Sequence, residues 1–453
     1  MTHLLIRDAE LVATMTGEEI PGGWVAITDG LVEAVGRPGA EPEADEVVSA
    51  RDSLVTPGLI NTHHHIFQNL TRAYGPAANL SLVDWLKAQF PIWSQLDEEA
   101  VYVSTWIGLA ELALGGCTTT TDHLYLHPRP RLIDAEIAAA REVGLRFHPT
   151  RGSYSRRQEQ GGLAPNSMVE DEDEILADSE RLIRTYHDPS HGAMVRIALA
   201  PTSPWTVTPE LMKRTAELAK RCDVRLHTHL AQDRDEDIFC LEHFGRRPVD
   251  QFEEMGWGSD RSWVAHCIFV NDEEIRRLGS WRTGVAHCPS SNMLLAGGIA
   301  PVQDYRRAGV PVGLGCDGSS SADHASLWLE ARTALLLGRL RGGPTAMSAR
   351  DALEIATVGS AACLGRRGEL GVIVPGAVAD LVVWPLTGVS FAGAHTDPAE
   401  ALLRCAPVSA RHTIVNGRFV VRDGQLTHPG LEEMLQRHNR IAQSWLAAAA
   451  GVR

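Results

Sequence analysis

The sequence predicts an α/β protein built on a (β/α)8 TIM barrel, with a small β-sandwich formed by its N- and C-terminal segments. Eight strand-like apolar runs alternate with helix-like stretches through the middle of the chain. Four of these runs end in histidine or aspartate, as expected where the parallel strands of a barrel present catalytic groups to one site. Short β patterns occupy both ends, so one barrel with an appended domain accounts for all 453 residues.

The first segment, residues 1–56, reads as short strands separated by turns. Its apolar runs cover residues 4–6, 10–12, 23–27 and 31–36. Asp29-Gly30 between the last two runs is a strong signal for a β-hairpin. Because this segment alone is too small to bury a core easily, we expect it to pair with strands from the end of the chain.

The barrel is predicted over residues 57–368, entered by a strand that begins slightly earlier. Its candidate strands are residues 54–61, 117–123, 145–151, 195–201, 224–230, 262–267, 284–289 and 310–317. Helix-like stretches lie between or after them, for example residues 98–115, 132–143, 174–186, 209–222 and 325–340. This alternation predicts parallel strands joined by helical crossovers.

The last segment, residues 369–453, returns to β patterns and ends in a helix. Its strand-like runs are residues 377–384, 411–415 and 418–421. Asn416-Gly417 predicts a hairpin turn between the last two. Residues 430–451 predict a terminal helix, whose apolar part is too short to cross a membrane. We therefore expect these strands to complete the β-sandwich begun by residues 1–56.

Composition narrows the class of partner and the compartment. The chain has 42 Lys and Arg against 57 Asp and Glu, a formal charge of −15, which argues against nucleic acid or an anionic membrane as a partner. Its eight cysteines are scattered without CxxC spacing, so we expect reduced thiols and a cytoplasmic location. Residues 1–8 lack a basic region followed by a sustained apolar run, so no signal peptide is expected.

An apolar run that ends in His63-His64-His65 carries the strongest chemical signal. Side chains alternate faces along a strand, so His63 and His65 point the same way and His64 points oppositely. Two imidazoles side by side at the end of a strand can hold one divalent metal and leave positions for other ligands. The pair His227 and His229 later in the chain repeats this arrangement.

Four residues form the best candidate ligand set for one metal ion: His63, His65, His229 and Asp317. A mononuclear Zn²⁺ or Fe²⁺ site needs three or four nitrogen or oxygen ligands and an open position for water. Asp317 can also hydrogen-bond that water, whose pKa the metal lowers. His266, at the end of another run, is placed to polarise the substrate or to shuttle a proton; a supporting role beside the ligands is the alternative.

These runs also carry a resemblance to a known family. PGLINTHHH, HTHLAQ, WVAHC, HCPSSN and LGCDGS together resemble the amidohydrolase superfamily, in the branch of aminohydrolases that act on purines, pterins and s-triazines. THHHIFQNLTRA, VDWLKAQFPIW and GCTTTTDHLYLHP look most like the 8-oxoguanine deaminase group. The resemblance implies one divalent transition metal per chain, Zn²⁺ first and Fe²⁺ second, on the four residues named above. It also implies that Gln68 and Trp85 contact the substrate; a solvated glutamine and a packing tryptophan are the alternatives.

One position departs from the pattern of that branch. The fifth-strand histidine is usually followed three residues later by a glutamate that relays protons, and here that position is Gln232. A neutral amide can place water or a ring by hydrogen bonds but cannot act as a general acid or base near neutrality. Three explanations stay open: His266 and Asp317 carry the proton transfers, Asp233 or Asp235 substitutes, or activity is reduced.

The resemblance implies a hydrolytic deaminase of an amino-substituted, purine-like heterocycle, and within that group the conversion of 8-oxoguanine to urate and ammonia. A hydroxy-s-triazine aminohydrolase or halohydrolase is the first alternative. A catalytically impaired ligand-binding homologue is the second, because of Gln232. The expected partner is a small heterocyclic molecule, and the resemblance makes a homo-oligomer an expectation.

Overall fold

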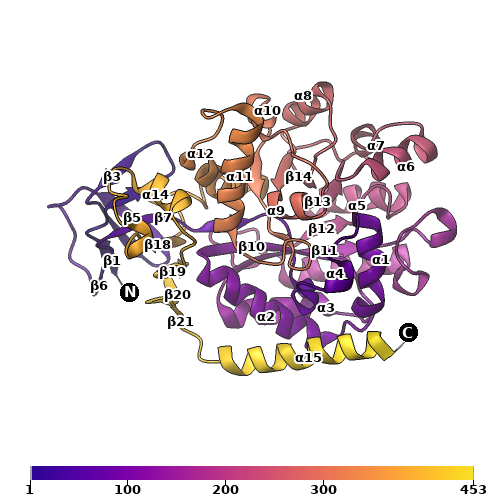
Figure 1. Cartoon of the computed structure of the whole chain (residues 1–453), viewed down its shortest axis with the longest axis horizontal. Coiled ribbons are helices and arrows are strands. Elements are labelled where there is room, and N and C mark those ends of the chain that lie inside the picture. The colour runs from indigo at the N-terminus through magenta and orange to yellow at the C-terminus, as the bar shows by residue number, and fades with distance from the viewer. Residues whose placement is uncertain (1–2, 452–453) are drawn as a thin grey trace.

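A closed barrel of eight parallel strands forms the centre of the molecule, as the sequence predicts (Figure 1). The computed structural model describes residues 3–451; residues 1–2 and 452–453, which the predicted terminal segments include, lie outside that description. The barrel strands are β8 (Leu59–Asn61), β10 (Cys117–Leu124), β11 (Arg146–Ser153), β12 (Ala198–Pro201), β13 (Arg225–Leu230), β14 (Ser262–His266), β15 (Gly284–His287) and β16 (Val312–Leu314). The barrel closes where β16 pairs with β8.

Helices cover the outside of the barrel. They are α1 (Leu82–Trp93), α2 (Glu98–Leu114), α3 (Leu132–Val143), α4 (Glu172–Tyr186), α5 (Pro209–Cys222), α6 (Arg234–Phe244), α7 (Pro248–Glu254), α8 (Asp272–Trp281), α9 (Pro289–Leu294), α10 (Val302–Arg307) and α11 (Leu327–Gly342). Their starts follow from local sequence: Thr208 accepts a hydrogen bond from Leu211 N and Pro209 occupies the first position of α5. The five helix-like stretches that the sequence analysis gives for the barrel are all helical.

Two predicted barrel strands differ from the structure. Residues 54–61 form two strands, because β7 (Ser53–Pro57) pairs with β18 (Leu381–Pro385) outside the barrel and only β8 enters it. The division falls at Gly58, where a Cβ atom would lie 2.0 Å from Thr118 Oγ1, so the chain can pass there only as glycine. The run 310–317 likewise ends at Leu314, and Asp317 belongs to the short strand β17 (Asp317–Gly318) paired with β9 (His64–His65).

The two ends of the chain build two sheets beside the barrel. One has the order β5-β4-β1-β6 and the other the order β21-β20-β19-β18-β7-β2-β3. Their remaining strands are β1 (Leu4–Arg7), β2 (Leu11–Ala13), β3 (Glu19–Pro21), β4 (Trp24–Thr28), β5 (Leu31–Gly36), β6 (Glu46–Ser49), β19 (His412–Val415), β20 (Arg418–Arg422) and β21 (Gln425–Leu426). Apolar side chains of both sheets share one core, which includes Val25, Val55 and Val383. We propose residues 1–56 and 369–453 as the two parts of this domain, and 57–368 as the barrel.

Further helices connect and cover these parts. α12 (Ala349–Glu354), a π-helical turn (Ile355–Gly359) and α13 (Ser360–Cys363) follow α11, and α14 (Pro398–Arg404) lies between β18 and β19. The terminal helix α15 (Leu431–Gly451) runs along the barrel against α1 and α2 (Figure 1). Its His438 Nε2 lies 2.8 Å from Oδ1 of Asn69, in the 3₁₀ helix Ile66–Thr71 that directly follows His65.

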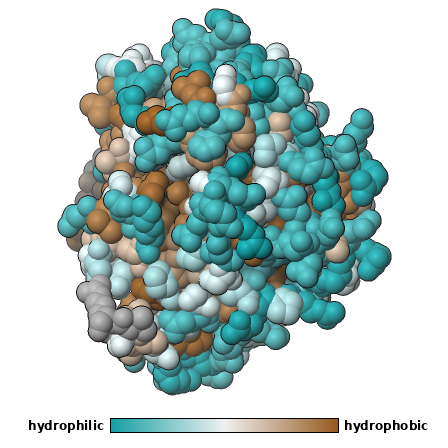
Figure 2. Space-filling model, turned by 90° about the vertical axis from the view of Figure 1, so that its right-hand side faces the viewer, coloured by the Kyte–Doolittle hydropathy of each residue, from teal (hydrophilic) through white to brown (hydrophobic). Residues whose placement is uncertain are grey.

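One face of the outer surface shows how polar and apolar side chains are distributed. The face drawn in Figure 2 is mostly hydrophilic, and its apolar side chains occur in small groups between polar ones. Among the described residues, no helix is both long enough and apolar enough to span a membrane. The buried apolar side chains lie within the barrel, between the barrel and its helices, and between the two terminal sheets.

Candidate metal centre and active site

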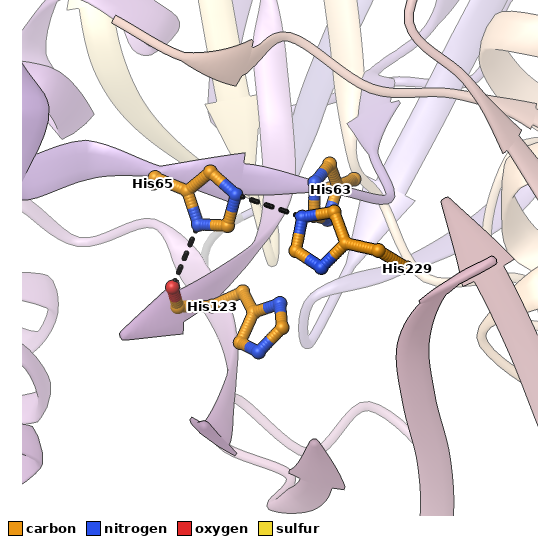
Figure 3. A group of neighbouring side chains, drawn as sticks. All are labelled: His63, His65, His123 and His229. Carbon is orange, nitrogen blue, oxygen red and sulfur yellow. Dashed lines mark hydrogen bonds between the residues drawn. The ribbon is translucent and has the colours of Figure 1, made fainter. Parts of the chain in front are cut away.

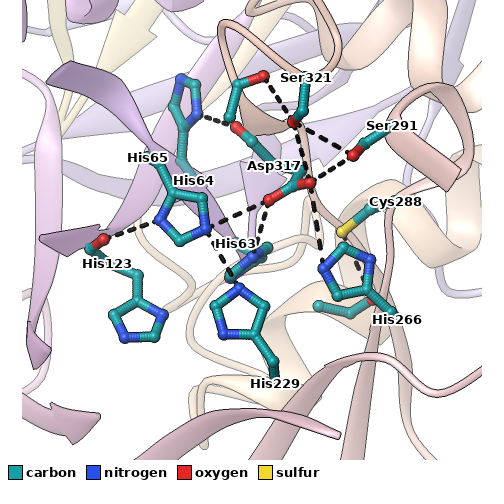
Figure 4. A network of polar contacts seen from close by, with 12 residues as sticks. His63, His64, His65, His123, His229, His266, Cys288, Ser291, Asp317 and Ser321 are labelled. Carbon is teal, nitrogen blue, oxygen red and sulfur yellow. Dashed lines mark hydrogen bonds and ion pairs between the residues drawn. The ribbon is translucent and has the colours of Figure 1, made fainter. Parts of the chain in front are cut away.

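The strand ends bring the four predicted ligands into one buried cluster (Figure 4). His63 follows β8, His65 ends β9, His229 lies in β13 and Asp317 begins β17. Oδ1 of Asp317 lies 3.1 Å from His63 Nε2 and 3.3 Å from His65 Nε2. The Nε2 atoms of His65 and His229 are 3.2 Å apart. The side chains that the sequence expected to converge therefore lie within contact of one another.

Hydrogen bonds to backbone carbonyls fix the protonation of two of these rings. His65 Nδ1 lies 2.8 Å from the carbonyl oxygen of His123, and His229 Nδ1 lies 2.7 Å from that of Thr202 (Figure 3). A carbonyl oxygen only accepts, so each Nδ1 carries the hydrogen and each Nε2 presents a lone pair. Two lone pairs 3.2 Å apart cannot hydrogen-bond to each other.

The third ring is fixed by a relay of two histidines. His227 Nδ1 donates to the Trp263 carbonyl at 2.9 Å, which leaves His227 Nε2 as an acceptor. His63 Nδ1, 2.8 Å from that atom, must therefore donate to it. His63 Nε2 is left as a buried lone pair that points at the carboxylate of Asp317.

Three imidazole lone pairs and one carboxylate oxygen thus meet with no hydrogen atom between them. A cation satisfies such a set, and nitrogen and oxygen donors suit a divalent transition metal. Two overlapping groups have all their donor atoms within 4.8 Å of one another: His63, His65, His123 and His229, and His63, His229, His266 and Asp317. The residues present therefore fit the metal that the sequence predicts.

Charges and burial keep candidate ligands in the protonation states that metal binding requires: neutral imidazoles and an ionised carboxylate. Burial lowers the pKa values of His63 and His229 well below the ordinary range, so both rings are neutral at pH 7. Burial alone would raise the pKa of Asp317, but attraction to the neighbouring His266 outweighs it and keeps that pKa well below its usual value. A carboxylate among neutral imidazoles gives the cluster a negative charge.

His266 lies beside the other oxygen of Asp317. Its Nε2 is 4.0 Å from Asp317 Oδ2, and its Nδ1 is 2.8 Å from Asn292 Oδ1, so Nε2 is free (Figure 4). Asp317 Oδ2 accepts hydrogen bonds from the hydroxyls of Ser291 and, at 3.1 Å, Ser321. His266 and Asp317 both have positive φ, 70° and 55°, an uncommon conformation that concentrates at functional sites.

His64 behaves as the alternation of the strand predicts. It points away from the cluster, and its Nδ1 contacts the backbone carbonyl oxygen of Asp317 (Figure 4). Burial lowers its pKa to about 4, so the ring is neutral. His64 therefore connects β9 to β17 and helps to position the backbone of Asp317.

A cavity opens next to the cluster. It encloses about 490 Å³, including its open mouth, and its lining includes His65, His229 and Asp317. Gln68 and Trp85, the two predicted substrate contacts, also line it. Gln68 Nε2 donates to the Tyr125 hydroxyl at 2.9 Å, and its buried Oε1 has no partner.

Gln232 lines the same cavity, whereas the two acids suggested as substitutes do not. Asp233 is the N-cap of α6, where its side chain accepts from Asp235 N at 2.9 Å, and Asp235 is exposed. A third acid, Glu236, is buried and accepts from Gln232 N at 3.0 Å; burial raises its pKa to about 8. Substitution by Asp233 or Asp235 has no support in this geometry.

Sequence reasoning missed several residues that contribute to the site. His123 ends a strand that was correctly predicted, so the rule that identified the other ligands applied to it as well. Glu236 could have been found from its spacing to Asp233, which is that of a capping box. Tyr125 and Ser291 lie in the motifs GCTTTTDHLYLHP and HCPSSN but received no role. Only the packing of distant segments brings them, together with Ser321, to the cavity and to Asp317.

Comparison with known proteins places this site in a family. The chain matches the amidohydrolase family over residues 54–420. It is 46% identical to an 8-oxoguanine deaminase of Pseudomonas aeruginosa, across 99% of this chain and 100% of that protein. It is 36% identical to a hydroxydechloroatrazine ethylaminohydrolase of Pseudomonas sp. (strain ADP), across 95% of this chain and 88% of that protein.

Solved structures share the fold along nearly the whole chain. Atrazine chlorohydrolase of Arthrobacter aurescens, complexed with zinc, has a TM-score of 0.93 at 31% identity, covering 97% of this chain and 100% of that one. An adenosine deaminase of Xanthomonas campestris with bound zinc has a TM-score of 0.89 at 25% identity, covering 99% and 98%. Zinc in both neighbours, together with the donor cluster, supports a divalent metal. The chain belongs to the amidohydrolase family of hydrolytic enzymes, as its motifs predicted.

Proposed function

We propose that this chain is a metal-dependent deaminase that converts 8-oxoguanine and water to urate and ammonia. The observation that carries the proposal is the convergence of imidazole lone pairs and a carboxylate at the wall of a cavity. The choice of 8-oxoguanine is supported by the 46% identity to a deaminase of that purine over the length of both chains.

In this proposal His63, His65, His229 and Asp317 hold one divalent ion, Zn²⁺ in preference to Fe²⁺. Zinc in the two structural neighbours supports that preference. When bound, such an ion supplies a water of lowered pKa that can attack a ring carbon near neutral pH. His63 and His229 are neutral and Asp317 is ionised, so an ion can bind to them without displacing a proton.

His266 and Asp317 carry the proton transfers. His266 is neutral because burial lowers its pKa, and its Nε2 is free. Its ring does not line the cavity, whereas Asp317 does, so Asp317 would take the proton from the attacking water and pass it to His266 Nε2. In the hydrolysis a C–O bond from water would replace the C–N bond, and His266 and Asp317 would return the proton to the departing amine. Ser291 and Ser321 hold Asp317 Oδ2 in place, 4.0 Å from His266 Nε2.

Three residues of the cavity are proposed to bind the ring. Trp85 offers a flat apolar face for a planar heterocycle. The unpartnered Oε1 of Gln68 accepts a hydrogen bond from a ring N–H, since its amide nitrogen is already engaged with Tyr125. Gln232 offers both a donor and an acceptor to a ring edge that also has both.

The test is a product-release assay on metal-analysed protein with four compounds: 8-oxoguanine, guanine, isoxanthopterin and hydroxyatrazine. We expect 8-oxoguanine to have the highest kcat/KM and to yield urate with one ammonia. Turnover of hydroxyatrazine with 8-oxoguanine inert would replace this proposal with the triazine alternative, which the 36% identity to a triazine ethylaminohydrolase favours. Tight binding of 8-oxoguanine without turnover would indicate a catalytically impaired ligand-binding homologue, the alternative that Gln232 favours.

A further inference from the structure

His123 is a further buried imidazole at the candidate metal centre, beside His65 and His229 (Figure 3). It is the second-last residue of β10, as His229 is of β13, and the proposed mechanism does not use it. Its Nδ1 is buried without a partner. Its donor atom lies within 4.8 Å of those of His63, His65 and His229.

Hydrogen bonding gives His123 the arrangement of a metal ligand. Its Nε2 lies 2.9 Å from the carbonyl oxygen of Ala200, so Nε2 carries the hydrogen and Nδ1 is a lone pair. His65 and His229 show the same arrangement, with one nitrogen donating to a backbone carbonyl and the other free. Histidines that bind metals almost always donate their other ring N–H in this way. By contrast, the buried His148 on the neighbouring strand β11 has no hydrogen-bond partner at either nitrogen.

The position of His123 favours a metal over a substrate as its partner. Its ring centroid lies 5.0 Å from that of His229, 5.3 Å from that of His65 and 5.9 Å from that of His63. The ring is fully buried and does not line the cavity, unlike those of His65 and His229. In Figure 4 it lies on the side of the cluster away from Asp317 and His266.

We propose that His123 Nδ1 is an additional ligand of the metal. This inference rests on the proposed function, because it requires that the other four residues hold an ion. Five protein donors and an open water position make six, whereas Zn²⁺ in proteins prefers about four ligands. His123 therefore reduces, without reversing, the preference of the site for Zn²⁺ over ions that readily accept six ligands, such as Fe²⁺.

The test uses the full chain loaded with Co²⁺, whose visible absorption grows stronger as its coordination number falls. His123→Gln keeps a donor for the Ala200 carbonyl and removes the lone pair at the Nδ1 position. His148→Gln is the matched control, since it changes another buried barrel histidine outside the cluster. We expect H123Q to absorb more strongly, to bind Co²⁺ at least about tenfold more weakly in chelator competition, and to take up less Fe²⁺ relative to Zn²⁺. H148Q should match the wild type in all three.

A wild-type spectrum, affinity and Fe²⁺-to-Zn²⁺ ratio in H123Q would overturn the inference, and so would equal changes in H148Q. Should H123Q fail to fold, X-ray absorption of the Co²⁺-loaded wild type counts the bound imidazoles directly. We expect four bound imidazoles. A count of three bound imidazoles in a protein that still deaminates its substrate would overturn this inference but not the proposed function. A wild-type protein that binds no metal would overturn the proposed function together with it.

Discussion

At the scale of single residues, the site is defined by where its hydrogen atoms are. His65 and His229 each donate one ring N–H to a backbone carbonyl, and His63 donates its ring N–H to His227. Every remaining ring nitrogen is then a lone pair aimed at its neighbours or at Asp317. A positive charge would relieve the repulsion between these acceptors, so the same geometry that supports a divalent metal also orients its candidate ligands.

His229→Ala should lose most of the bound metal and most of the activity. The variant removes one of the converging donors and leaves the Thr202 carbonyl without its partner. Metal analysis after dialysis is expected to show well under one ion per chain, with turnover falling in parallel. Stoichiometric metal and unchanged turnover in this variant would show that His229 is not a ligand.

Gln232→Glu should raise kcat on a deaminase substrate without changing metal content. The amide cannot transfer protons, whereas general acid–base groups contribute roughly 10²–10⁴-fold in rate. Glu236, which accepts from the backbone of residue 232, has a pKa of about 8 and is mostly neutral at pH 7, so the new carboxylate meets little repulsion from it. A fall in kcat would instead identify Gln232 as a specificity element for a substrate that needs a neutral partner.

At the scale of elements, local pattern predicted the strands and helices but not where a strand changes partner. Residues 54–61 form one continuous apolar run, yet Ser53 pairs with Pro385 in a sheet while Asn61 pairs with Leu314 in the barrel. Those partners lie hundreds of residues away, so nothing local reveals the division. The ligand histidines were predictable because alternation along a strand is local; the Ser291 and Ser321 contacts to Asp317 were not.

The start of α6 predicts a pH dependence of stability. Glu236 keeps its proton up to about pH 8 in the folded chain, whereas its ordinary pKa is 4.5. Between these values the unfolded chain binds fewer protons, so the free energy of unfolding falls as pH rises from about 4.5 to 8. Glu236→Gln, which can still accept from Gln232 N, should lessen the loss of Tm between pH 5.5 and pH 8.

Asp235→Asn serves as the control for that measurement, because Asp235 occupies the same first turn of α6 but is exposed. Its Tm should follow that of the wild type at both pH values. An E236Q variant that loses as much Tm as the wild type over this range would show that Glu236 does not titrate there.

At the scale of the whole molecule, the candidate ligands connect three distant parts of the chain. His63 and His65 adjoin β8, His229 lies on β13, and Asp317 follows β16, which closes the barrel against β8. An ion bound to all of them acts as a cross-link present only in the folded state, so it stabilises that state by mass action.

Removal of the metal should therefore lower Tm by several degrees, on the scale of about 4 kcal/mol for an ion at a thousand times its Kd. Calorimetry of metal-free and reloaded protein measures this difference, and reloading should restore it. H229A should show little response to added metal. Equal Tm values for metal-free and loaded wild type would mean that the ion does not connect the strands.

The discontinuous architecture also orders events during synthesis. A ribosome adds about 5–20 residues per second, and β7 and β8 emerge long before β18 and β16, with which they pair. The first strand of the barrel therefore has only one of its two neighbours, β10, until β16 has been made. The complete set of candidate ligands exists only once Asp317 has left the exit tunnel, so an ion held by all four cannot template the beginning of the assembly.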